Sequence, residues 1–299
     1  MFKKSRVPVR VFRSSDKGAP QNVVGASDNA FKILNACLVE GYGDTASLGW
    51  ELKFKVGSTG IFMPTDKKQT GWGLRISQSE KYGARVSAVR NPSSDDTFEL
   101  ESAYENNEAY FLHDNTNGDT KTRDWTLVGH SLGFILIFHV TEHSSDGPFN
   151  TTLYFGRVPT LAAADDHNYL LCYSTDDSYR YLSYRTRSSY LFMARDYLGL
   201  NLGRYGTKSK TEGISHRFPA RICNGFWCDD VYITEYVEEQ WEVRGYLPGI
   251  MNVVGDAYPY DRKVLEDFDG SGDSFLYLRF YGYSSSPKGW LVNLTAWEV

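Results

Sequence analysis

The sequence lacks the features that mark several large classes of protein. No apolar run approaches the ~20 residues that a helix needs to cross a bilayer. The N-terminus carries charges but no apolar stretch of the kind that a secretory signal contains. We therefore expect a chain that folds in a cytoplasm and makes no membrane contact.

Cysteine is also scarce, with 4 residues in a chain of 299. They are too few and too scattered for a disulfide framework, so buried reduced thiols are expected. A zinc site built on Cys223 and Cys228 would need two further ligands at suitable spacing, and none is nearby. No cofactor is expected. The four positions are Cys37, Cys172, Cys223 and Cys228.

Positive charge is in deficit, since 32 Lys and Arg against 37 Asp and Glu give a net charge of −5. This balance argues against a surface that neutralises nucleic-acid phosphates, so no direct nucleic-acid contact is expected. The N-terminus is the local exception. Its basic residues fit an exposed arm that contacts an acidic neighbouring subunit, and they fit a solvated terminus equally well. They are Lys3, Lys4, Arg6, Arg10 and Arg13.

Aromatic residues are abundant: 21 Tyr, 17 Phe and 7 Trp make up 15% of the chain. Aromatic and β-branched side chains suit the pleated, half-buried surface of a sheet, which favours an all-β fold. They are also enriched at protein interfaces and on sugar-binding faces, so abundance alone does not choose between these uses. The tryptophans considered for glycan stacking are Trp72, Trp125, Trp227, Trp241 and Trp290.

Strand patterns recur along most of the chain. In residues 48–56, Trp50, Leu52, Phe54 and Val56 alternate with polar residues, which predicts a strand with one buried face. Turn-forming clusters separate most of the runs, and no fixed repeat is found. Comparable runs occupy residues 73–77, 84–89, 110–113, 125–128, 134–140, 152–155, 169–173, 190–194, 231–236, 241–246, 275–281 and 290–294.

These patterns predict a mostly β protein whose antiparallel sheets pack as a sandwich or barrel, with one short N-terminal helix. Residues 1–25 are expected to form an extended arm and residues 26–299 a β-rich body. A single body and two β subdomains that divide near residues 160–210 both remain open. In the helix, Ser27 is the expected N-cap and Gly41 the expected end. One face would carry Phe31, Leu34, Cys37 and Leu38.

Several segments share their wording and order with a known family. Residues 14–43 contain S-S-D-K-G-A-P and L-N-A-C-L-V-E-G-Y-G. R-D-W-T-L-V-G follows at residues 123–129, and F-G-R at 155–157 precedes Asp165, Asp166 and Tyr169. R-G-Y-L-P-G stands at 244–249 and D-G-S-G at 269–272. Together they resemble a family of tailed-bacteriophage virion structural proteins.

The resemblance implies a non-enzymatic structural component of the virion, assembled in the host cytoplasm. It would form a symmetric oligomer through contacts with copies of itself and with other virion proteins. The neck or collar and the tail or baseplate are the favoured positions. A receptor- or glycan-binding module on the virion surface, with host glycan as partner, is the alternative, together with a capsid decoration protein.

Residues 129–133 read G-H-S-L-G and so match the G-x-S-x-G pattern of serine hydrolases, in which Ser131 would be the nucleophile. That elbow needs a helix directly after the serine. Here the apolar, β-branched residues 134–140 indicate a second strand. The motif is therefore interpreted as a hairpin turn, with a serine hydrolase as the remote alternative.

Residues 267–273 resemble the start of a calcium loop, since oxygen-bearing side chains alternate as they do in an EF-hand. The twelfth position is Leu278, where an EF-hand needs a bidentate Glu, and no helices flank the segment. A glycine-rich hairpin is the favoured interpretation and a calcium site the weak one. The candidate ligands are Asp267, Asp269, Ser271 and Asp273.

Overall fold

A computed structural model describes most of the chain. The described residues are 5–80, 83–102, 110–112, 123–139, 150–161, 165–173, 190–193, 221–223, 226–237, 240–254, 262–280 and 288–299. Within them the strands form three six-stranded sheets and one two-stranded sheet, and every strand pair is antiparallel. The prediction of a mostly β protein with antiparallel sheets is confirmed.

We name the three large sheets by their place in the fold. The helix-side sheet contains β3 (Glu51–Val56), β4 (Thr59–Met63), β5 (Trp72–Glu80), β6 (Gly83–Arg90), β7 (Leu100–Glu101) and β8 (Tyr110–Leu112). The central sheet contains β2 (Arg10–Arg13), β9 (Trp125–His130), β10 (Gly133–Phe138), β11 (Thr151–Arg157), β12 (Tyr169–Tyr173) and β13 (Tyr190–Met193). The C-terminal sheet contains β14 (Arg221–Cys223), β15 (Phe226–Val237), β16 (Gln240–Val254), β17 (Arg262–Glu266), β18 (Ser274–Phe280) and β19 (Lys288–Asn293).

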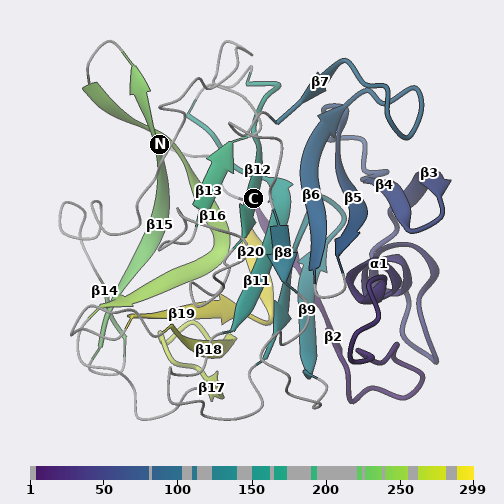
Figure 1. The fold of residues 1–299 in the computed structure, drawn as a ribbon. Helices are drawn as coiled ribbons and strands as arrows, with labels where there is room; N and C mark the ends of the chain where they lie inside the picture. Colours follow the sequence, from purple (N-terminus) through teal and green to yellow (C-terminus); the bar gives the residue numbers. More distant parts are fainter. Residues whose placement is uncertain are drawn as a thin grey trace.

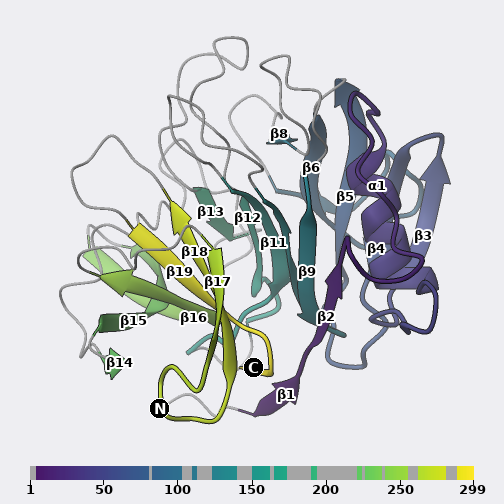
Figure 2. The same ribbon diagram turned by 90° about the horizontal axis from the view of Figure 1, so that it is seen from below.

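The central sheet is the middle layer of the molecule (Figures 1 and 2). Successive residues of β10 enter different cores, because side chains alternate across a strand. Phe134 and Leu136 pack in the core shared with the helix-side sheet, while Ile135 and Ile137 pack in the core shared with the C-terminal sheet. A strand with two buried faces has no polar side, which explains the continuous apolar run after G-H-S-L-G.

The N-terminal segment is extended, as expected, but it is not a separate arm. β1 (Arg6–Pro8) pairs with β20 (Ala296–Glu298), and β2 forms the edge of the central sheet beside β9. Phe12 of β2 is fully buried in the core that faces the helix. The boundary predicted at residue 25 is therefore wrong for the described residues. The segment alternates basic with apolar residues, and its two strands pair with strands more than 100 positions away in the sequence.

The single helical segment lies against the outer part of the helix-side sheet (Figure 2). α1 (Asn29–Leu34) continues into the π-helical turn η1 (Asn35–Glu40) and ends at Gly41, whose φ is 79°. The predicted apolar face is confirmed, because Phe31, Leu34, Cys37 and Leu38 are buried. The predicted N-cap is wrong. Asp28 occupies that position and makes no side-chain capping hydrogen bond.

β3 departs from the alternation predicted for it. A register shift between Leu52 and Phe54 marks a β-bulge, which adds a residue and turns the following side chains to the other face. Leu52 packs in the core that faces the helix, whereas Phe54 packs with Ile61 on the opposite face of the sheet. Val56 is 60% exposed. The prediction that these side chains share one buried face is therefore wrong.

Residue 160 does not separate two sheets. β11 and β12, which precede and follow it, are paired along their length in the central sheet. The central sheet and the C-terminal sheet also share a core, and Trp297 of β20 packs in that core.

Among the described residues, no helix has the length and apolar character that spanning a membrane requires.

Candidate functional site

G-H-S-L-G forms a β-hairpin turn, as its interpretation predicts. β9 and β10 are paired with His130 opposite Gly133, which leaves Ser131 and Leu132 as a two-residue turn. The glycines permit close backbone packing. A Cβ on Gly129 would lie 2.6 Å from the Gly133 carbonyl oxygen, and one on Gly133 would lie 3.0 Å from the Gly156 Cα. The strand that follows leaves no place for the helix of a hydrolase elbow.

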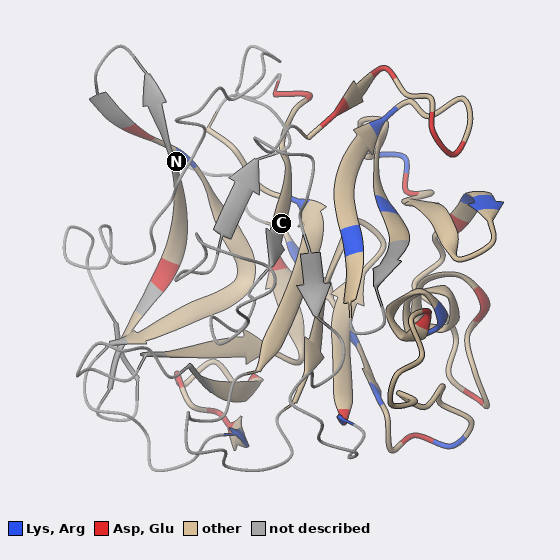
Figure 3. Cartoon of the chain, in the orientation of Figure 1, with Lys and Arg blue, Asp and Glu red and all other residues tan. Residues whose placement is uncertain are grey.

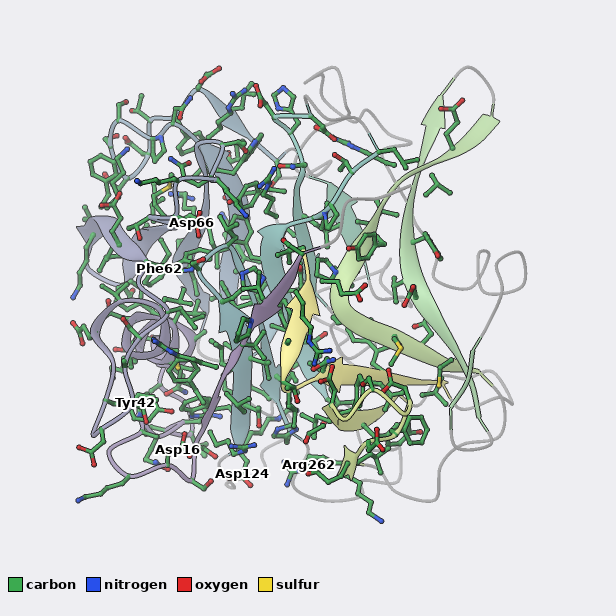
Figure 4. The ribbon with its side chains drawn as sticks, turned by 180° about the vertical axis from the view of Figure 1, so that it is seen from behind. Asp16, Tyr42, Phe62, Asp66, Asp124 and Arg262 are labelled. Atoms are coloured by element: carbon green, nitrogen blue, oxygen red, sulfur yellow. The ribbon has the colours of Figure 1, made fainter. Side chains whose placement is uncertain are left out.

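The Ser131 hydroxyl is bound to the neighbouring sheet. Its Oγ donates to Asp66 Oδ2 at 2.7 Å, from the hairpin of the central sheet to the loop between β4 and β5. Asp66 is labelled beside Phe62 in Figure 4. Desolvation raises the pKa of Asp66, but hydrogen bonds from the Lys68 amide and the Ser131 hydroxyl outweigh it and lower that pKa. A carboxylate that is held ionised in this way accepts a hydrogen bond from the serine, and the proton stays on the hydroxyl.

His130 does not form a relay with Ser131. Its Nδ1 accepts from the Leu132 amide at 3.1 Å, and its ring lies edge-on to Trp297 with the centroids 5.3 Å apart. Burial lowers the pKa of His130 to about 4, against a weaker opposing effect of Asp66. Among the described residues no imidazole hydrogen-bonds Ser131, so the base–nucleophile contact of a serine hydrolase is not assembled.

The candidate calcium ligands Asp267, Asp269 and Asp273 accept hydrogen bonds from groups of the same chain. Asp267 Oδ1 accepts from the Gly272 amide at 2.6 Å, and Asp269 Oδ1 accepts from the Ser271 amide at 3.1 Å. Asp273 is buried and accepts from Asn293 Nδ2 at 2.7 Å and from Arg6. No group of three metal-ligating side chains occurs among the described residues. The loop joins the paired strands β17 and β18, so the hairpin interpretation is confirmed.

Two residues of the predicted contact arm, Arg6 and Arg10, bind groups of their own chain. Arg6 forms an ion pair with the buried Asp273, and Arg10 Nη1 donates to the Ala46 carbonyl oxygen at 3.3 Å. The Arg13 side chain is exposed. Lys3 and Lys4 lie outside the described residues. A contact of these basic residues with a neighbouring subunit stays a prediction.

A buried polar junction joins all three sheets, and the sequence patterns did not reveal it. Asp165, in the loop between β11 and β12, forms an ion pair with Arg244 of β16, and their side chains are 1% and 4% exposed. In the same loop the Asp166 carbonyl oxygen accepts from Trp72 Nε1 at 3.1 Å. Asp165 and Arg244 stand in two segments of the phage resemblance. That shared membership is the one sequence signal that points to both of them.

The burial of the tryptophans distinguishes a packing role from the glycan-stacking role considered for them. Trp72, Trp125 and Trp290 are at most 4% exposed, so their rings pack inside the protein and offer no open stacking platform. The side chains of Trp227 and Trp241 lie outside the description.

No family model matches this sequence, and a search of curated proteins also finds no match.

Proposed function

We propose that this chain is a non-enzymatic structural component of a tailed-bacteriophage virion. It belongs to the neck or collar, or to the tail or baseplate, and assembles as a symmetric oligomer with other virion proteins and copies of itself. One observation carries the proposal. Two of the phage-like segments meet in space, where Asp165 of one and Arg244 of the other form the buried ion pair that joins the central and C-terminal sheets.

The chemistry of the candidate sites supports a structural role. The Ser131 hydroxyl, the loop carboxylates of residues 267–273 and the guanidinium of Arg6 all bind groups of the same chain. Each of these bonds joins sheets or fixes a hairpin. Polar side chains that bind groups of their own chain stabilise the fold. This suits a rigid structural subunit that contacts its neighbours through its surfaces.

A receptor- or glycan-binding module on the virion surface is the alternative from another class. Sugar recognition by stacking needs aromatic faces in contact with solvent. The three described tryptophans considered for that role are buried instead. The structural role is therefore favoured over the glycan role.

The proposal is tested on purified particles. Gradient-purified virions are digested and quantified by mass spectrometry, and a density map of the particle is searched for the three-layer body. We expect the chain at a fixed ratio to the major capsid protein, in a ring or lattice of defined symmetry. Its absence from intact particles, while it accumulates in the infected cell, would contradict the proposal.

Removing residues 1–25 is not a clean test of subunit contact. That deletion takes away β1 and β2, exposes the site filled by Phe12 and leaves buried Asp273 without Arg6. A failure to enter particles after such a change would not distinguish a lost subunit contact from a lost fold. Substitution of Lys3 and Lys4 by Ala leaves both strands in place, and reduced occupancy in particles would assign those two residues to a subunit contact.

A further inference from the structure

β3 is an open edge of the helix-side sheet. It pairs with β4 on one side, and among the described residues no main-chain hydrogen bond joins its other side to another segment. Its end is uncovered, with Val56 60% exposed. An unpaired strand edge can accept a further strand or loop from another chain. The charged residues on and near β3 indicate what kind of partner segment would bind there.

The open edge is basic. Residues 51–71 contain four lysines and two acids: Glu51, at the start of β3, and Asp66, whose carboxylate is bound to Ser131. All four lysines are exposed, and the end of β3 is blue in Figure 3. The Nζ atoms of the two on β3 lie 5.9 and 5.4 Å from the ring centroids of Phe54 and Phe31, respectively, and form no ion pair with described residues. We call the two lysines of β3 the basic edge: Lys53 and Lys55.

The other edge of the same sheet is acidic. β7 pairs with β6 at the end of the strand order opposite to β3. Residues 91–102, which include β7 and the loop before it, contain four carboxylates and no lysine or arginine. Asp96 and Glu99 are exposed, and this region is red in Figure 3. We call the four the acidic segment: Asp95, Asp96, Glu99 and Glu101.

We propose that the basic edge of one copy binds the acidic segment of a second copy, so that the helix-side sheets of successive copies align head to tail. Opposite charges on two different surfaces of one molecule select a heterologous contact over a two-fold one. Each copy then has one surface of each kind. A closed ring results when the rotation between copies closes, and a filament when it does not. The inference rests on the proposed function and names the self-contact that it requires.

The test uses charge reversal on the purified full-length chain. One variant carries Lys53→Glu and Lys55→Glu, and the other carries Asp96→Lys and Glu99→Lys. Self-association is measured by sedimentation velocity and native mass spectrometry at low and high salt, with circular dichroism and thermal unfolding as checks on folding. Lys17→Glu with Lys263→Glu is the matched control, because it reverses two exposed charges that lie on neither surface.

We expect the wild-type chain to self-associate at low salt and to dissociate as salt screens the contact. Each reversal variant alone should lose more than about tenfold in association constant, because like charges then face each other. The two variants mixed together should associate again, since each offers the surface that the other now lacks. The control should behave as the wild type.

Three outcomes would overturn the contact: a wild-type chain that stays monomeric at low salt, reversal variants that associate normally, or a mixture of folded variants that does not recover. Failure of the proposed function is recognised separately. If the chain is found in purified virions while any of these outcomes is seen, the virion role stands and the edge contact is wrong. If the chain associates as expected but is missing from virions, the edge contact stands and the virion role is wrong.

Discussion

The guanidinium of Arg244 contacts both carboxylate oxygens of Asp165, with Nε 2.9 Å from Oδ2 and Nη2 3.0 Å from Oδ1. The same guanidinium donates to the His167 carbonyl oxygen at 3.2 Å, and the His167 amide donates to Asp165 Oδ1 at 2.9 Å. The ion pair thus fixes the loop between β11 and β12 against β16. Its near-complete burial makes each charge depend on the other.

Removing either partner of this pair should destabilise the protein strongly. Asp165→Leu and Arg244→Leu should each lower the free energy of unfolding by about 3–5 kcal/mol, because the remaining charge stays buried without its counter-ion. Urea denaturation followed by tryptophan fluorescence measures the loss. The double variant is the control and should lose much less than the sum of the single variants. Strictly additive losses would mean that the two charges do not depend on each other.

Two glycines with similar backbone angles should respond differently to alanine. Gly249 and Gly270 have φ of 71° and 76°, so a side chain at either position meets the same left-handed strain. A Cβ on Gly249 would lie 2.2 Å from Trp297 Nε1, whereas nothing lies within 4 Å of a Cβ on Gly270. Gly270→Ala should cost about 1 kcal/mol. Gly249→Ala should cost at least about 2 kcal/mol more, because the buried indole must move.

Chemical denaturation of the two glycine variants, each compared with the wild type, measures that difference. Equal losses in both would show that the contact with Trp297 is not constraining. A near-UV circular dichroism change confined to Gly249→Ala would locate the effect at the indole.

The elements that could be predicted from sequence are those whose pattern is local. Residues 169–173 were expected to form a strand, and β12 has those bounds, because a short apolar run with polar flanks suffices to define it. The apolar face of α1 is likewise visible from residue spacing. β4 was not predicted, because Gly60 weakens its strand pattern. The structure explains this glycine by packing, since a Cβ at this position would lie 2.7 Å from the ring of Phe31.

What could not be predicted depends on contacts between distant residues. Val11 lies opposite Val128 and Val7 opposite Trp297, so the basic N-terminal segment gave no local sign of its partners. Ser131 and Asp66 are 65 positions apart, and no spacing rule connects them. The bulge in β3 was also missed, because one inserted residue reverses the alternation that was used to predict the strand.

The buried His139 should make the fold less stable in mild acid. Its Nε2 lies 2.8 Å from Thr126 Oγ1. Burial, and secondarily the positive charge of Arg262, lower the pKa of His139 from 6.5 to about 3, against an opposing hydrogen bond with Asn150. Below pH 6.5 the unfolded chain therefore binds a proton that the folded chain does not bind. Stability falls as the pH falls through this window, with a limiting slope of about 1.4 kcal/mol per pH unit.

His139→Gln is the matched variant, since its amide can still bond Thr126 but does not titrate in this range. Urea denaturation between about pH 4 and pH 6.5 should give a shallower decline for this variant than for the wild type. His130, whose pKa burial lowers to about 4, contributes a decline of the same sign in both proteins. Parallel pH profiles would show that His139 is protonated in the folded state or is not buried.

Ser131→Ala should affect stability and leave hydrolysis unchanged. The hydroxyl donates to the Asp66 carboxylate across two sheets, and its loss should cost about 1 kcal/mol, a modest value because both side chains are partly exposed. A double-mutant cycle with Asp66→Asn measures the coupling. In a p-nitrophenyl ester assay the wild type and Ser131→Ala should both match buffer. Wild-type hydrolysis that disappears with the hydroxyl would establish Ser131 as a nucleophile and contradict the structural role proposed for this hairpin.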